Sequence, residues 1–446
     1  MNTPCNFPYF EIEVDKDGQF VTASQIDDVI KFVKSNAGAV KDLFVISHGW
    51  NNDMADARDL YERFFTELCK AFAQNAGTGV SANQCAVAGI LWPSKKFADS
   101  ELIPGGAAAV EADPSLVRAL DQLEELADSP AAKSRIEKAK QQLTDIEDDP
   151  GAQKAFVDQI RSLLPNKTDC EEGLHPGFFK MEGDDLLENL SEPLPLATTA
   201  SDDPTEGGAA DIGVADLDTG DEEGEAQSLS SILSGIKGGA MRLLNFTTYY
   251  LMKDRAGKVG SGAVAQVLSR IQNESPTLRI HLVGHSFGCR VVTAAIANAP
   301  KPVASMTLLQ AAFSHNSFSP DFDASHKPGA FRSVIAPGKV TGPILISHTV
   351  KDRAVGVAYA VASRIARQNG AAVGDANDPY GGLGRNGAQH TPEAKDGDLL
   401  PVAGKYSLVA PTKIFNLKAD SIIGGHSDVV KPEIAYALLQ AAGLSK

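Results

Sequence analysis

A serine in a glycine-flanked pentapeptide carries the strongest chemical signal in this chain of 446 residues. Residues 284–288 read Gly-His-Ser-Phe-Gly, a G-x-S-x-G pattern that follows a short apolar run and precedes a helical pattern. Such a pattern is typical of a sharp strand-to-helix turn that lifts a serine hydroxyl above a sheet. We therefore predict that Ser286 is a nucleophile, and that Gly284 and Gly288 let the strand and the helix close on each other. The alternative is a glycine-rich turn in which the serine has no chemical role.

A serine nucleophile requires a base, and the position of each histidine restricts the choice. The base removes the hydroxyl proton, and an acid fixes the tautomer of the base. Where this turn occurs in an α/β sheet, the chain order is serine, acid, histidine. Of the nine histidines, only His390 and His426 follow the best acid candidate. His426 comes after an apolar strand-like run and a Gly-Gly pair, whereas His390 lies in a polar, glycine-rich stretch. The sequence therefore predicts His426 as the base.

The acid candidate is Asp352, which lies between a strand-like run (343–350) and a helix-like run (354–367). Asp is also favoured as a helix N-cap, and the two roles are compatible. Asp428 is too close in sequence to His426 to orient it, and we expect it to cap the last helix instead. Weaker candidates for the acid are Asp321, Asp323, Asp375 and Asp378.

Backbone donors for a developing negative charge are expected from two places. One is the amide of Phe287, directly after the nucleophile. The other is the loop His48-Gly49-Trp50, which follows a strand-like run. In this loop Gly49 lets the backbone turn towards the site, and the amide of Trp50 is the predicted donor. By itself, the His-Gly pair is equally typical of an ordinary strand-ending turn.

The His-Gly-Trp loop, the G-x-S-x-G turn, Asp352 and His426 occur in this order, each at a predicted strand end. Together they resemble an α/β-hydrolase of the serine esterase and lipase branch. The resemblance covers roughly residues 1–98 and 240–446, and the turn and the His-Gly loop are its specific parts. It implies a mostly parallel, doubly wound sheet flanked by helices, no cofactor, and acyl transfer to water. Cys289 replaces the glycine or alanine often found there, a small change because cysteine is also small and often buried.

Alternating strand and helix patterns support the same architecture. An N-terminal hairpin is predicted, with its turn at residues 16–18, and the glycine-rich segment 368–406 is predicted to be a surface loop. That segment matches neither a Walker loop nor a dinucleotide fingerprint. The predicted strands are 42–47, 85–92, 280–283, 306–313, 343–350 and 414–417, and the main predicted helices are 23–36, 55–75, 246–272, 290–299 and one from about 429.

The predicted hydrolase core, 1–98 and 240–446, is interrupted by an acidic insertion at 99–239. Residues 101–230 contain 31 Asp and Glu against 9 Lys and Arg, a net charge of −22, whereas the whole chain carries −16. The acidity therefore belongs to the insertion, and its field would repel the phosphates of a nucleic acid. Helices are predicted at 114–127, 131–146, 152–164 and 229–244, and the stretch 197–227 is too polar to be ordered.

The insertion has two possible roles. It could form a cap or lid over the active site that shapes the acyl pocket, since an insertion between these strands lies near the rim of the site in this fold. Alternatively, it could be a docking module for a partner that never touches substrate. The apolar faces of its helices must pack on something in both cases.

Five cysteines occur in the chain, odd in number and without a C-x-x-C pair. No secretory signal precedes the first strand, and no apolar run approaches 18 residues. These observations predict a reduced, cytoplasmic protein without a transmembrane segment. No histidine or cysteine pair has the spacing of metal ligands, so no metal site is expected. Oligomeric state is left open.

The sequence therefore predicts a serine hydrolase that cleaves a small-molecule or lipid-like carboxylic ester through an acyl-enzyme intermediate, with a weak preference for short-to-medium acyl groups. A thioesterase, an amidase or a peptidase would use the same residues, because they do not choose the leaving group. The alternative from another class is a non-catalytic scaffold that keeps the fold and binds a partner through its acidic insertion.

Overall fold

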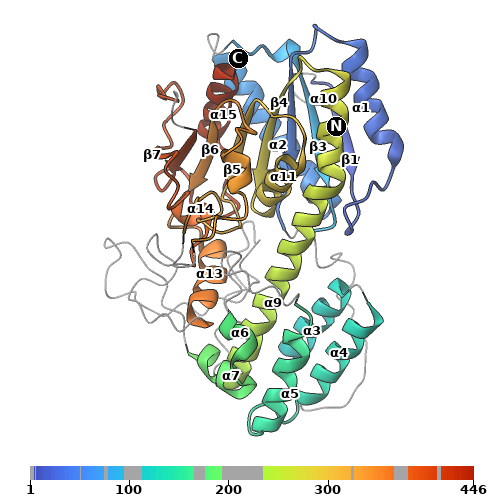
Figure 1. Cartoon of the computed structure of the whole chain (residues 1–446), viewed down its shortest axis with the longest axis vertical. Coiled ribbons are helices and arrows are strands. Elements are labelled where there is room, and N and C mark those ends of the chain that lie inside the picture. The colour runs from blue at the N-terminus through green and yellow to red at the C-terminus, as the bar shows by residue number, and fades with distance from the viewer. Residues whose placement is uncertain are drawn as a thin grey trace. The chain divides into compact units, whose positions relative to one another are not determined.

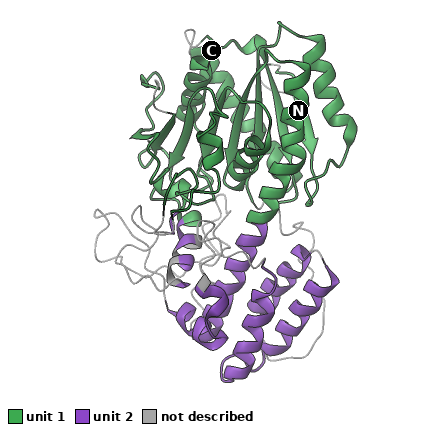
Figure 2. Cartoon of the chain, in the orientation of Figure 1, with its two compact units in different colours: residues 1–94, 253–355, 382–446 green, residues 95–252, 356–381 purple. Residues whose placement is uncertain are grey.

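The computed structural model divides the chain into two compact units (Figure 2). Unit 1 comprises Met1–Ser94, Lys253–Val355 and Gly382–Lys446, and unit 2 comprises Lys95–Met252 and Gly356–Gly381. Unit 2 thus holds the predicted insertion, 99–239, together with residues 95–98, 240–252 and 356–381. The structure describes residues 5, 7–50, 52–74, 79–94, 113–127, 129–164, 176–192, 235–322, 326–365, 380–408 and 413–445.

A single sheet of eight strands forms the framework of unit 1 (Figure 1). Its strands are β1 (Tyr9–Glu13), β2 (Asp42–Ser47), β3 (Cys85–Leu91), β4 (Arg279–His285), β5 (Ser305–Leu309), β6 (Ile344–His348), β7 (Ala394–Asp398) and β8 (Ile414–Lys418). They lie in the order β1-β3-β2-β4-β5-β6-β8-β7, and every neighbouring pair is parallel. The predicted parallel α/β sheet is therefore confirmed.

Helices cover both faces of this sheet, because its central strands are apolar on both sides. The helix α2 (Met54–Gln74) packs against α15 (Pro432–Leu444), and both share one core with strand residues such as Phe44 and Val283. The alternate strand residues point to the opposite face. There α1 (Ala23–Ser35), α10 (Ala265–Glu274) and α11 (Phe287–Asn298) pack side by side.

The long helical pattern predicted over 246–272 is two helices joined by a π-helical turn. α9 (Gly235–Val259) leads into the turn at Gly260–Val264, and α10 follows. A Cβ on Gly260 would lie 2.3 Å from the carbonyl oxygen of Val291, so only glycine permits this approach to α11. The distortion therefore coincides with close packing, which periodicity alone cannot show.

Unit 2 consists mainly of short helices whose starts are encoded locally. Asp113, Ser129 and Asp149 each accept a hydrogen bond from a first-turn amide, and each is followed by a proline at the first helical position. The described helices here are α3 (Pro114–Leu126), α4 (Pro130–Gln142), α5 (Pro150–Arg161), α6 (Pro176–Lys180) and α7 (Gly183–Ser191), with parts of α9 and α13 (Arg353–Ile365). The segment 197–227, predicted to be mobile, lies outside the described residues.

Two predictions about unit 1 need correction. The predicted turn at 16–18 is present, but the hairpin is limited to one antiparallel bridge, Val14–Phe20, and β1 itself pairs in parallel with β3. The segment 368–406 is not simply a loop, since it contains α14 (Leu383–Asn386) and the edge strand β7. β7 reads Ala-Lys-Asp-Gly-Asp and is largely exposed. A charged edge strand lacks the apolar signal by which strands are predicted.

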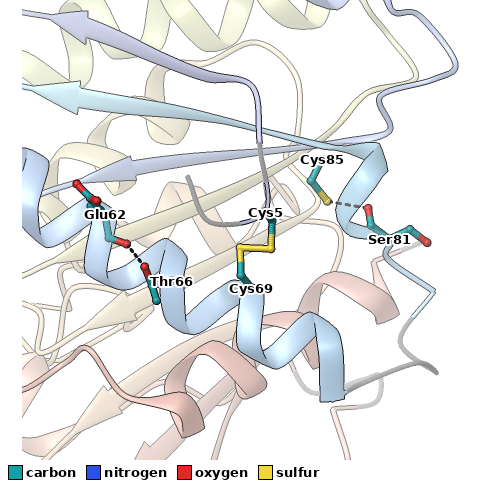
Figure 3. The surroundings of a disulfide bond; sticks show 6 residues. All are labelled: Cys5, Glu62, Thr66, Cys69, Ser81 and Cys85. Atoms are coloured by element: carbon teal, nitrogen blue, oxygen red, sulfur yellow. Dashed lines mark hydrogen bonds between the residues drawn. A yellow bond between two sulfur atoms is a disulfide. The ribbon is translucent and has the colours of Figure 1, made fainter. Parts of the chain in front are cut away.

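Cys5 and Cys69 form a disulfide between the N-terminal segment and α2 (Figure 3). This corrects the expectation that the cysteines are reduced, and the 64-residue separation of the pair explains why spacing did not reveal it. Closing a loop of this length stabilises the fold by about 4 kcal/mol in the chain-entropy model. Among the described residues, Cys85 and Cys289 are free and buried. No helix in the described ranges is long and apolar enough to cross a membrane.

Candidate active site

Ser286 lies at the sharp turn between β4 and α11. Its backbone has φ 54° and ψ −123°, a conformation that is rare and strained for a residue with a side chain. The surroundings hold it there: the Ser286 amide donates to the carbonyl of Leu309, and its own carbonyl accepts from the Cys289 amide. The predicted strand-to-helix turn is thus present, with the serine at its tip.

Three glycines permit this geometry, because neighbouring backbone leaves no room for a side chain. A Cβ on Gly284 would lie 2.5 Å from the Cα of Cys289, and one on Gly288 would lie 2.0 Å from the carbonyl oxygen of Ser47. On the loop after β2, a Cβ on Gly49 would lie 2.6 Å from the Cβ of Ser286. Each distance is far below van der Waals contact, so these positions require glycine.

His426 and Asp352 meet Ser286 at the carboxyl edge of the sheet. The Nε2 atom of His426 lies 2.8 Å from the Ser286 hydroxyl oxygen, and its Nδ1 atom lies 2.9 Å from Oδ2 of Asp352. Ser286 follows β4, Asp352 follows β6 and His426 follows β8, and parallel strands bring these ends to one edge. The Asp352 side chain is fully buried and that of His426 is only 10 % exposed, so bulk water does not separate the partners.

Asp352 has two hydrogen-bonding roles at once. While Oδ2 contacts His426, Oδ1 accepts a hydrogen bond of 3.0 Å from the amide of Val355 in the first turn of α13. The two roles considered for this residue therefore coexist. The cap fixes the orientation of the carboxylate towards the imidazole.

The other candidates lie elsewhere. Asp321 pairs with the exposed His326, with 2.7 Å between Oδ2 and Nδ1. Asp428 does not cap α15, whose N-cap is Lys431; its Oδ2 accepts from the Gly424 amide instead. His390 is exposed and has a positive φ of 48°. Asp323, Asp375 and Asp378 lie outside the described residues.

The loop His48-Gly49-Trp50 follows β2 and passes directly beside the nucleophile, as the contact of Gly49 with Ser286 shows. Phe287 is the first residue of α11, where backbone amides lack partners within the helix and the dipole favours negative charge. The rings of Trp50 and Phe287 lie 6.1 Å apart. The loop and the helix start are therefore neighbours, and the assignment of their amides to an oxyanion hole stays a prediction.

His48 has a structural role in this loop that the sequence did not reveal. Its Nε2 accepts a hydrogen bond from the Trp92 amide, so Nδ1 carries the proton and donates to the carbonyl of Gly49 at 2.9 Å. Complete burial lowers the pKa of His48 to about 4, which keeps the ring neutral. A neutral histidine thus ties the loop beside Ser286 to the end of β3. The His-Gly pair was the only sequence signal.

The arrangement can transfer a proton from a hydroxyl to an imidazole that a carboxylate orients. A serine oxygen activated in this way can attack a carbonyl carbon. In the described part of the chain, no group of three or more His, Cys, Asp or Glu residues is placed to hold a metal ion.

Comparison with known proteins gives one match. The family model described as the alpha/beta hydrolase fold matches residues 247–342, which contain β4, Ser286, α11 and β5. Asp352 and His426 lie beyond the matched segment. Neither a curated protein nor a solved structure matches the chain.

Proposed function

The chain belongs to the α/β-hydrolase superfamily, and from this we propose that it is a serine hydrolase that cleaves a carboxylic ester. The observation that carries the proposal is the hydrogen-bonded series Ser286–His426–Asp352 at the ends of three parallel strands. The strained backbone of Ser286 supports it further, because strain of this kind is concentrated at functional sites.

In the proposed reaction, the Ser286 hydroxyl attacks the acyl carbon while its proton moves to Nε2 of His426. Asp352 stabilises the imidazolium that forms, and the amides of Phe287 and Trp50 bind the oxyanion. The tetrahedral intermediate collapses, and His426 gives its proton to the departing alkoxide oxygen. Water then attacks the acyl-enzyme in the same way, which releases the acid and restores the serine. No cofactor is part of this proposal.

The first prediction concerns the three members of the series. Ser286→Ala and His426→Ala should each lower kcat for a p-nitrophenyl ester by at least about 10⁴-fold, since the nucleophile and the base act together. Asp352→Asn should cause a smaller but still large loss. Reaction with a fluorophosphonate probe should label the wild-type protein and should be lost in Ser286→Ala.

Asp321→Asn serves as the matched control, because the Asp321 carboxylate contacts His326 and not His426. Near-normal activity of Asp352→Asn together with a large loss in Asp321→Asn would show that the acid is misassigned. Folded protein that the probe does not label would instead support the alternative of a non-catalytic scaffold that binds a partner through the acidic insertion.

The substrate class is narrowed by a chain-length series. We propose short-to-medium acyl esters. This preference rests on the apolar periodicity of 114–164 in the sequence, since the large apolar side chains of these helices, such as Leu120 and Phe156, are buried. A series of p-nitrophenyl esters from two to sixteen carbons, with matched thioesters and amides, separates esterase from thioesterase, amidase and peptidase activity.

A further inference from the structure

His285, the residue directly before the nucleophile, contacts the loop that carries the base. Its Nε2 atom lies 3.0 Å from the backbone carbonyl oxygen of His426, and the centroids of the two imidazole rings are 5.2 Å apart. His285 is buried, with 8 % of the residue exposed. The turn that presents Ser286 therefore also contacts the backbone of the residue that must deprotonate it.

The direction of this hydrogen bond follows from its acceptor. A carbonyl oxygen cannot donate, so Nε2 of His285 carries the proton. Burial, together with the neighbouring His426, lowers the pKa of His285 to about 3. The other ionisable groups that face the ring are Asp352, which raises the pKa, and His48, which lowers it. The ring is thus a neutral donor at neutral pH.

The loop that carries His426 has few constraints before it. The base follows Gly424 and Gly425, and a Cβ on Gly425 would meet no atom within 4 Å. The Gly424 amide is held by Oδ2 of Asp428 at 2.9 Å. Two consecutive glycines allow many backbone conformations, so a hydrogen bond to the carbonyl of the following residue restricts the orientation of the imidazole.

We propose that His285 is a positioning residue for the base: by donating to the His426 carbonyl, it holds the imidazole in register with the Ser286 hydroxyl. The inference rests on the proposed function, because it deepens the assignment of His426. It predicts an effect on proton transfer in the transition state rather than on substrate binding.

Three variants separate the hydrogen bond from the bulk of the ring. His285→Phe keeps an aromatic ring and removes the donor. His285→Gln places an amide nitrogen at the same number of bonds from Cβ as Nε2, and so restores the donor. His285→Asn places its nitrogen where Nδ1 was and cannot reach the carbonyl in the same way.

We expect kcat, counted per site by fluorophosphonate titration, to fall about 10- to 100-fold in His285→Phe and His285→Asn, because a shift of about 1 Å in a reacting group has effects of this size. KM should change less than about twofold, since the contact acts on the transition state. His285→Gln should recover kcat to within about threefold of wild type.

If the wild type is active and His285→Phe has a normal kcat, the inference about His285 is wrong and the proposed function still stands. A His285→Gln variant as impaired as His285→Asn has the same consequence, and this comparison decides the matter even where His285→Phe fails to fold. A wild-type protein without Ser286-dependent labelling or ester turnover overturns the proposed function, and this inference with it.

Discussion

Gly49 brings the loop after β2 into contact with the nucleophile, and its lack of a side chain is what allows this. The Cβ and the hydroxyl oxygen of Ser286 would lie only 2.6 Å and 3.1 Å from a Cβ at this position. His48 holds the same loop through the Gly49 carbonyl. The loop therefore cannot retreat freely to accommodate a methyl group.

Gly49→Ala should consequently displace Ser286 or the loop and lower kcat/KM by about 100-fold or more. Ester turnover and the rate of fluorophosphonate labelling measure this effect. Gly397→Ala is the matched control, because a Cβ there would meet nothing within 4 Å. Equal activity of the two variants would contradict the geometry described here.

At this scale, residue type and chain order were sufficient to select the three residues that the structure brings together. A strained serine turn requires flanking glycines, and the order serine, acid, histidine leaves few combinations. The contacts of His285 and His48 could not be predicted, since they join residues 141 and 44 positions apart. Such contacts depend on the folded arrangement of four strand ends, those of β2, β3, β4 and β8.

Among the elements, buried strands were predictable and exposed ones were not. The four central residues of β2, Leu43–Ile46, are buried and apolar, and the seven buried residues of β3 contain no polar or charged side chain apart from a thiol. β7 lacks any such signal. β1 pairs with β3 rather than with the segment that follows the turn at 16–18, and this choice depends on residues distant in the sequence. Local capping residues explain why α3, α4 and α5 began close to their predicted positions.

The helices of 114–164 allow the cap hypothesis to be tested. Replacing them with a short linker should change the acyl-length preference if they form a cap, because a cap lines the pocket. The ester series, measured on variant protein that still reacts with the fluorophosphonate probe, gives the answer. An unchanged length profile would favour a docking module instead.

Deletion of 197–227 is the matched control for that experiment. The predicted disorder of this segment implies that its removal leaves folding and the length profile unchanged, since closure entropy depends only weakly on loop length.

For the whole molecule, buried neutral histidines make stability depend on pH. The pKa of His48 is lowered to about 4 and that of His285 to about 3, mainly by burial, whereas an unfolded histidine has a pKa of about 6.5. Between these values the unfolded chain binds protons that the folded chain does not. The contribution of these histidines to the free energy of unfolding is therefore fully present above about pH 6.5. As the pH falls towards 4, this contribution decreases by about 1.4 kcal/mol per pH unit for each histidine.

The Tm should accordingly fall as the pH is lowered from 7 to 4.5. His48→Gln should show a shallower dependence, because one of the depressed groups is removed. His390→Gln, a substitution of an exposed histidine, is the control. Identical Tm profiles for wild type and His48→Gln would show that His48 titrates normally in the folded protein.

The order of the strands also has a consequence for folding during synthesis on the ribosome. β4 pairs directly with β2, yet about 190 residues separate the end of β3 from the start of β4. At about 5–20 residues per second, a ribosome needs roughly 10–40 s to synthesise that stretch. Throughout this interval the apolar edge of β2 has no partner strand. Nascent chains should therefore be vulnerable to mispairing and should benefit from a chaperone that shields this edge until β4 emerges.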